Sequence, residues 1–138
     1  MKTNSINNNG CSVCEQGKEN YTTFIAGAFR GTEYYQYDYR HATTGELFSM
    51  VAKSLEECRK RRDEWLFNTW WQWLNFGELE SITGIEQDRD GNNEIDAQFI
   101  DDANKFWQSK NFEEKRKIYQ SNSDLHDVVE GRMRDYIS

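Results

Sequence analysis

The chain has 138 residues, a net charge of −7, 14% aromatic residues and no proline. A chain of this length supports one core or two small ones, and aromatic side chains of roughly 150–250 Å² each supply apolar area for it. There is no apolar run approaching the ~20 residues of a membrane span, and the first ten residues lack the apolar stretch of a signal peptide. We therefore expect a cytoplasmic protein without a membrane partner.

The charge is distributed unevenly along the chain. Residues 1–66 hold nine Lys or Arg and nine Asp or Glu, whereas residues 67–138 hold eight and fifteen. The acidic second half argues against nonspecific binding of nucleic acid by that half, but not by the first.

Residues 1–20 are rich in Asn, Ser, Gly and charged side chains, and we interpret them as a mobile leader. Three strands are predicted after it. Residues 21–30 contain strand-forming Thr, Phe and Ile, and a turn follows at 30–32. Tyr residues then alternate with polar residues at the period of two that a half-buried strand requires, and Thr44-Gly45 closes a short turn before residues 46–52 run back.

A long amphipathic helix is predicted to begin after Ser54. The Ser54 hydroxyl and Glu57 have the spacing of a capping box, and Cys58 falls on the apolar stripe as a small core residue. We expect this helix to run to Gly77, where glycine offers a stop.

Residues 78–100 contain isoleucines and Thr83 on either side of Asp90-Gly91, which favours a second hairpin. Short helices are predicted after it, one of them capped by Asn111 with Glu114. The predicted fold class is α+β: a three-stranded antiparallel sheet packed on a long helix, then a second hairpin and short C-terminal helices. We expect a β-β-β-α module over 21–77, with the acidic residues 78–138 packed on it as one unit.

The second half of the long helix carries aromatic residues that point in nearly every direction around its axis. One interpretation is a helix covered on both sides by the rest of the domain. The alternative is a partner or homodimer interface, because Trp is enriched at interface hot spots. The residues predicted for that interface are Trp70, Trp71 and Trp73.

Two patterns suggest metal binding. Asp88, Asp90 and Asn92 occupy positions one, three and five of an EF-hand-like calcium loop, but position twelve is Phe99 where the loop requires glutamate, so we favour a polar turn over weak Ca²⁺ binding. Cys11 and Cys14 have the spacing of half a zinc site, yet no second CxxC exists. Cys58 and His41 could complete it only if the leader folds back onto the helix and the hairpin, so zinc is disfavoured and no cofactor is expected. Three cysteines, an odd number, fit a reducing compartment.

The densest positive run, residues 59–62, lies one turn into the predicted helix. Acidic residues flank it at helical spacing, so a solvated, salt-bridged face is one interpretation. The other is a nucleic-acid surface, in which basic side chains contact phosphates and a polar strand residue reaches base edges. The residues of that surface would be Gln36, Arg40, Lys53, Arg59, Arg61 and Arg62.

No catalytic motif accompanies these features. The two histidines, His41 and His126, lie outside any HExxH pattern, and the sequence has no P-loop, GxGxxG or nucleophile elbow. We expect His126 to face solvent near a helix start, and we expect no enzyme activity.

Residues 10–68 resemble a family of small uncharacterised proteins carried by conjugative mobile elements of gut anaerobic bacteria. The motifs that carry the resemblance are QYDYRH, TGELFS and SLEECRKRRDEWL. The order of strand, turn, strand and helix is also similar to the arm-site DNA-binding domains of tyrosine integrases and to plant AP2 domains. In those domains a three-stranded sheet, backed by one helix, lies against DNA.

The resulting expectation is a noncatalytic accessory protein of a mobile element that binds a macromolecule, with nucleic acid slightly favoured. The alternatives are an acidic, inhibitor-like module that binds a basic protein, and a calcium-stabilised structural protein.

Overall fold

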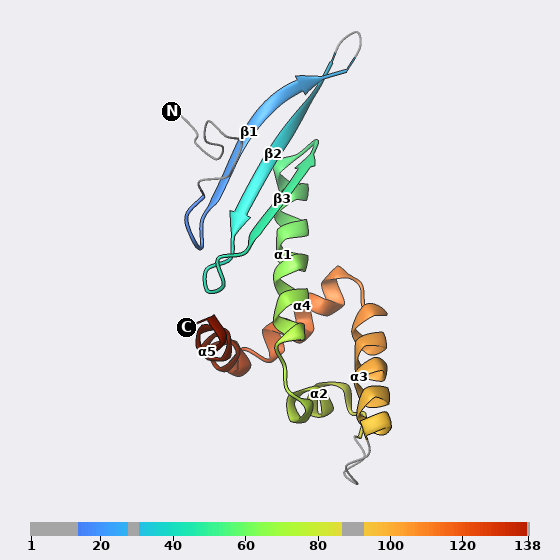
Figure 1. Ribbon diagram of the computed structural model, residues 1–138. Helices are drawn as coiled ribbons and strands as arrows, with labels where there is room; N and C mark the ends of the chain where they lie inside the picture. Colours follow the sequence, from blue (N-terminus) through green and yellow to red (C-terminus); the bar gives the residue numbers. More distant parts are fainter. Residues whose placement is uncertain (1–13, 28–30, 87–92, 138) are drawn as a thin grey trace. The chain divides into compact units, whose positions relative to one another are not determined.

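The structure is a computed structural model that describes residues 14–27, 31–86 and 93–137 (Figure 1). Its strands precede its helices along the chain, which confirms the α+β class. The elements are β1 (Glu19–Ala26), β2 (Thr32–Arg40), β3 (Leu47–Ala52), α1 (Leu55–Gln72), α2 (Phe76–Thr83), α3 (Asn93–Gln108), α4 (Phe112–Ser121) and α5 (Asp124–Ile137).

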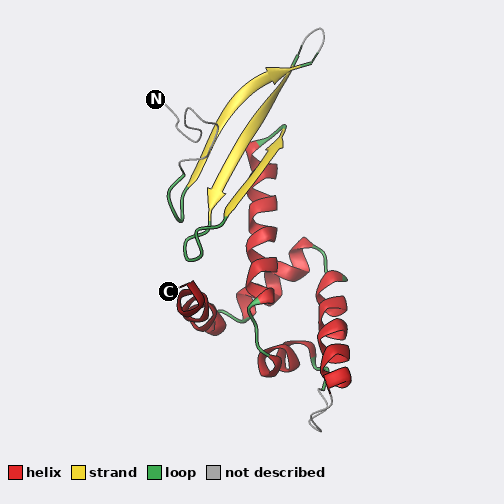
Figure 2. Cartoon of the chain, viewed as in Figure 1, coloured by secondary structure: helices red, strands yellow, loops and turns green. Residues whose placement is uncertain are grey.

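The three strands form one antiparallel sheet in the order β1-β2-β3, and Figure 2 shows them side by side. Tyr21 lies opposite Tyr37, which lies opposite Met50 on β3. Residues directly opposite one another share a face of the sheet, so this register divides the strands into two sets of side chains. We call the two sides the helix face, which includes Tyr37, and the outer face.

The helix face packs against the first half of α1. Tyr37 and Cys58 are completely buried there, which confirms Cys58 as a core residue. The Trp65 ring also packs against the helix face. Its centroid lies 6.4 Å from the centroid of the Tyr39 ring and 5.4 Å from that of the Phe48 ring. Alternating aromatic residues thus form a core despite the small number of aliphatic side chains.

Local hydrogen bonds fix the turns around this core. The Glu57 backbone N–H donates to the Ser54 hydroxyl at 3.1 Å, as expected for the helix cap. Between β2 and β3, the Nδ1 atom of buried His41 accepts hydrogen bonds from two successive backbone N–H groups, each at 3.1 Å. Gly45 closes the turn at φ 76°, a backbone conformation that favours glycine.

Residues 14–20 do not belong to the mobile leader that was predicted over residues 1–20. Residues 1–13 lie outside the described residues, but β1 already begins at Glu19 and Cys14 is buried. The Cys14 thiol donates to the Lys18 carbonyl at 2.7 Å, and Gly17 N–H donates to the Arg40 carbonyl at 2.7 Å. These contacts hold residues 14–18 against the end of β2.

The predicted long helix to Gly77 and the hairpin after it are both wrong. α1 ends at Gln72, and α2 occupies residues where we expected a strand. The reason is a capping box, in which Asn75 accepts from the Glu78 N–H and Glu78 accepts from the Asn75 N–H, both at 2.8 Å. Gly84 ends α2 at φ 74°.

The described residues form two compact units. One comprises residues 14–66 and 133–137, and the other comprises Phe67–Arg132, so the boundaries fall within α1 and α5. The second unit has an aromatic core of its own, with Trp71 stacked on Trp107 at 4.5 Å and Phe67 packed on Tyr119 at 4.9 Å. The capping box expected at Asn111 and Glu114 is present at the start of α4.

Two substitutions test whether residues 76–83 are helical. Asn75→Ala should lower the free energy of unfolding by about 1 kcal/mol, because it removes the N-cap. Gly77→Ala should leave stability unchanged or raise it by about 0.5 kcal/mol, because the added Cβ lies 3.6 Å from the nearest atom and alanine favours a helix. Urea unfolding measures both effects, and a destabilising Gly77→Ala would contradict the helical assignment.

Candidate functional site

Glu19, at the start of β1, is the centre of a polar cluster on the helix face. Its carboxylate accepts hydrogen bonds from the Tyr37 hydroxyl at 2.7 Å, from Arg59 at 2.5 Å and from Arg62 at 3.2 Å. Arg62 also donates to the Tyr37 hydroxyl at 3.0 Å and to Asp63 at 2.9 Å. A single carboxylate therefore joins β1, β2 and α1.

The electrostatics of the cluster agree with this geometry. The hydrogen bond from Arg59 holds the pKa of Glu19 below its usual value and, with the bond from Tyr37, outweighs the opposing effect of burial. Burial, followed by the hydrogen bond to Glu19, raises the pKa of Tyr37. Glu19 therefore stays ionised and Tyr37 stays neutral over the physiological range.

Two of the six residues predicted to contact nucleic acid belong to this cluster. Arg59 and Arg62 point toward the sheet and form ion pairs with Glu19, and Arg62 is largely covered. The salt-bridged interpretation of the positive run therefore describes these two arginines. A phosphate would have to compete with Glu19 for both of them.

Arg40, the third predicted residue, lies at the end of β2. Its guanidinium donates to the carbonyl of Cys14 at 2.7 Å and to the carbonyl of Gly45 at 2.8 Å. These two bonds fasten the segment before β1 and the β2–β3 turn to the same strand end. The charge is partly covered and acts as a clamp between backbone segments.

The remaining predicted residues do not complete one surface. Gln36 is half-buried on the outer face, whereas Arg59 and Arg62 contact the helix face. Lys53 and Arg61 are exposed, one just after β3 and the other on α1. The structure therefore separates Gln36 from two of the basic residues with which it was expected to act.

The outer face of the sheet carries exposed apolar and uncharged polar side chains, and half-buried Arg40 lies at its end, opposite Leu47. Phe24 and Tyr34 form a ring pair at 5.7 Å, and Phe24, Leu47 and Val51 are 41%, 41% and 48% exposed. The acidic side chain on this face, Asp38, is buried and accepts a hydrogen bond from Ser49 at 2.5 Å. Among the described residues we define the outer-face patch as Thr22, Phe24, Tyr34, Gln36, Leu47, Ser49 and Val51.

The tryptophans predicted as a partner interface are largely internal. Trp70 and Trp71 are each 4% exposed and pack within the second unit, and Trp73 is half-buried. Trp70 packs against Tyr119 and His126, at 5.2 Å and 6.0 Å between ring centroids. Trp70 and Trp71 are therefore core residues and do not form an accessible partner surface.

The predicted metal sites lie only partly within the described residues. Asp88, Asp90 and Asn92 lie outside the described residues, as does Cys11. Within residues 14–27, 31–86 and 93–137, no group of three or more His, Cys, Asp or Glu is arranged to hold a metal ion. Cys14 and Cys58 are buried, and burial raises the pKa of each thiol.

His126 does not face solvent as expected. Its ring stacks on Tyr119 at 4.0 Å, and its Nε2 atom lies 2.8 Å from the Tyr119 carbonyl oxygen. His41 likewise bonds to the backbone of the β2–β3 turn, so both imidazoles make structural contacts.

Sequence reasoning missed Glu19 because residues 1–20 were assigned to the leader. An acidic residue at the start of a strand, facing a helix with arginines at positions 59 and 62, is the signal that could have identified it.

Among the described parts of the chain, no helix is both long enough and apolar enough to cross a membrane.

A comparison with protein families finds a domain over residues 4–69. The matching family, DUF3873, is described as "Domain of unknown function, B. Theta Gene description". The match spans the whole sheet and most of α1, which agrees with the expected resemblance to an uncharacterised family over residues 10–68. No curated protein and no solved structure matches the chain.

The Glu19 cluster predicts a pH-dependent loss of stability. Glu19→Gln should lower the free energy of unfolding by roughly 1–3 kcal/mol at neutral pH, because it leaves Arg62 and Tyr37 without the charged acceptor. Since the folded-state pKa of Glu19 is lowered, its contribution is present above the unfolded-state pKa and is lost as the pH falls through the folded-state pKa. The gap between the parent and the variant should therefore narrow in acid.

Chemical denaturation across a pH series measures this gap. Glu33→Gln is the matched control, since Glu33 is an exposed glutamate in the same sheet, and it should change stability by less than about 0.5 kcal/mol. A gap that stayed constant down to the acid range would contradict the assigned role of Glu19.

Proposed function

We propose that this protein is a noncatalytic recognition module that binds another protein through the outer-face patch. The observation that carries the proposal is the chemistry of this patch, whose accessible side chains are aromatic, aliphatic, hydroxyl or amide. The occupant that suits it is a protein surface of uncharged apolar and hydroxyl side chains.

Charge complementarity favours a protein over a nucleic acid. Binding to nucleic acid depends on Lys and Arg side chains that replace the counterions of phosphates. Near the sheet, Arg59 and Arg62 are ion-paired with Glu19, and Arg40 is bonded to two carbonyls. Among the described strand residues of the outer face the cation is Arg40, opposite Leu47, and a phosphate there would have to compete with the carbonyls of Cys14 and Gly45 for it.

The side chains of the patch are also of the kinds found in protein interfaces. Tyr and Phe are enriched there, and a flat array of them provides contact area at a low cost in side-chain entropy. Phe24 with Tyr34 at one end, and Val51 on β3, would be the apolar anchors. Gln36 and Ser49 would then supply hydrogen bonds between them.

The proposal also covers the type of activity, the cellular location and the genomic setting of the protein. Recognition instead of catalysis is supported by the two histidines, which are both engaged in contacts with the backbone. A cytoplasmic location is supported by the buried thiol of Cys58 and by the odd number of three cysteines, which suit a reducing compartment. A conjugative mobile element of a gut anaerobe is the proposed genomic setting.

A photo-crosslinking residue at position 34 tests this proposal in cells that carry the gene. A crosslinker placed there should form a protein adduct, whereas one at exposed position 33, on the opposite side of the sheet, should not. Val51→Glu should reduce the adduct at least about tenfold, because it buries a charge without a partner in the interface. Thermal unfolding of each variant checks that the sheet remains folded.

The partner identified by this adduct must then bind the purified chain with the same dependence on Val51. An adduct with a second copy of the chain would identify the partner as self. Salt-sensitive binding to pools of DNA or RNA that Val51→Glu abolishes would overturn the proposal in favour of nucleic acid. Equal adducts at positions 33 and 34, or none at either, would also overturn it.

A further inference from the structure

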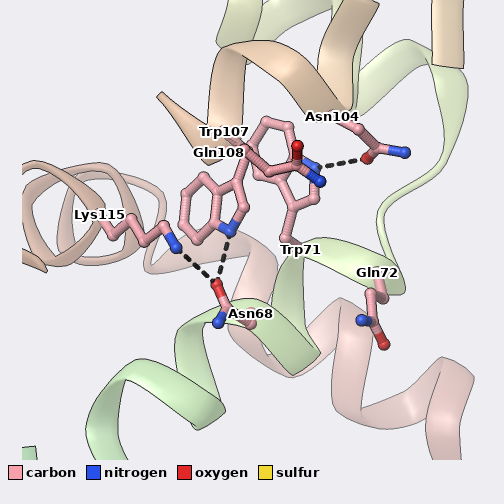
Figure 3. A pocket seen from close by; sticks show the side chains of 7 residues that line it. All are labelled: Asn68, Trp71, Gln72, Asn104, Trp107, Gln108 and Lys115. Atoms are coloured by element: carbon pink, nitrogen blue, oxygen red, sulfur yellow. Dashed lines mark hydrogen bonds between the residues drawn. The ribbon is translucent and has the colours of Figure 1, made fainter. Parts of the chain in front are cut away.

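The second unit contains a pocket that none of the preceding assignments uses. It has a volume of about 310 Å³, at the lower end of the range typical of small-molecule sites. The end of α1, the end of α3 and the start of α4 contribute its walls, as Figure 3 shows. The lining residues are Asn68, Trp71, Gln72, Asn104, Trp107, Gln108 and Lys115.

Six of these seven residues come from one sequence pattern that occurs twice. Residues 68–72 and residues 104–108 both read Asn, any residue, an aromatic residue, Trp and Gln. The two segments are the last five residues of α1 and of α3. Positions one, four and five of the pattern share one face of a helix, so each helix presents two amides and an indole to the pocket.

The two segments exchange equivalent hydrogen bonds. Trp71 Nε1 donates to the Asn104 side chain at 3.3 Å, and Trp107 Nε1 donates to the Asn68 side chain at 2.7 Å (Figure 3). Between these bonds the two indole rings stack, with their centroids 4.5 Å apart and their planes 13° from parallel. Each indole is thus fixed by an amide of the opposite helix, which makes this wall of the pocket rigid.

The glutamines at the last position of each pattern take no part in this exchange. Gln72 and Gln108 are exposed, and within the part of the chain that the structure describes no hydrogen bond engages either side chain. Each side chain has N–H donors and a carbonyl acceptor in one plane. The pocket therefore offers two complete primary amides to a ligand.

The charge of Lys115 is not required for such a ligand. Its ammonium donates to the Asn68 oxygen at 3.0 Å and lies 5.4 Å from the centre of the Trp107 ring, so it forms part of the wall. The other lining residues are amides and indoles, which carry no charge at physiological pH. The groups that we assign to the ligand therefore favour an uncharged molecule.

We propose that this pocket binds a small, uncharged, planar heterocycle with two cis-amide edges, as in a free pyrimidine base. A cis-amide edge presents an N–H donor beside a carbonyl acceptor. A glutamine side chain pairs with such an edge through two hydrogen bonds, as it does with the edge of a nucleic-acid base. Gln72 and Gln108 would each hold one edge, and the ring of the ligand would lie against the edges of the indoles.

The position of the indoles favours a planar ligand over a sugar. A sugar packs its C–H groups on the open face of an aromatic ring, but the faces of Trp71 and Trp107 lie against each other and each side chain is 4% exposed. The edge of an aromatic ring carries partial positive charge, which suits the π face or the carbonyl oxygen of a planar heterocycle.

The proposal is independent of the outer-face patch, because the pocket residues all belong to the second unit. The competing explanation is that the repeated pattern only fastens the end of α1 to α3 and contacts no ligand.

NMR titration of the isotope-labelled full chain with uracil tests the proposal. Uracil should shift the side-chain amide signals of Gln72 and Gln108 saturably, with a dissociation constant in the millimolar range. N,N′-dimethyluracil has the same ring with both N–H donors blocked, and pyrimidine is a smaller ring without a cis amide. Each should bind at least about tenfold more weakly than uracil.

Three variants assign the binding to this pocket. Gln72→Met and Gln108→Met each keep the length of the side chain and remove one amide, and each should weaken uracil binding at least about tenfold. Gln120→Met, a change at an exposed glutamine of α4 that does not line the pocket, is the matched control and should have no effect.

Because Gln72 and Gln108 are exposed, both methionine variants should remain folded, and urea unfolding checks this. Equal affinity for uracil and N,N′-dimethyluracil would overturn the proposal. Unchanged uracil affinity in either methionine variant would also overturn it, as would the absence of any saturable shift up to the solubility limit of uracil.

Discussion

The first unit depends on the carboxylate of Glu19, which brings a buried tyrosine and two arginines together between the sheet and α1. Each of these groups would be costly to bury alone, because a covered guanidinium needs an acceptor and a covered hydroxyl needs a partner. The Glu19 carboxylate accepts hydrogen bonds from both Tyr37 and Arg62, and Arg62 also donates to the Tyr37 hydroxyl. The aromatic residues around these groups supply the apolar contact. These hydrogen bonds hold a sheet with few aliphatic side chains against a highly charged helix.

This arrangement also changes how the positive charge of the helix should be interpreted. A run of four basic residues in a sequence is typical of contact with phosphate, but Arg59 and Arg62 point toward Glu19 and contribute to the fold. Part of the surface that remains accessible on the sheet is the outer-face patch, whose side chains are uncharged. Recognition of a protein is the function that we propose for this face.

The sequence predicted the elements whose signals are local. Alternating tyrosines identified β2, and Ser54 and Asn111 identified two helix starts. Asn75 carries the same cap signature as Asn111, but it was overlooked because the aromatic residues before it suggested an uninterrupted helix. The site was harder to predict, since the contacts of Glu19 with α1 and the meeting of Asn68 with Trp107 join residues about 40 positions apart. Which arginine faces the sheet, and which amide meets which indole, depends on packing that no local pattern specifies.

A double-mutant cycle between Glu19 and Arg62 is the most direct test of the central claim that these charges hold the sheet and α1 together. It compares the unfolding free energies of the parent chain, Glu19→Gln, Arg62→Gln and the double variant. The account predicts a coupling free energy of about 1–3 kcal/mol at neutral pH, because the two side chains share Tyr37 in a partly covered cluster. Effects that add to within about 0.5 kcal/mol would contradict it and would return Arg62 to the residues available for a phosphate.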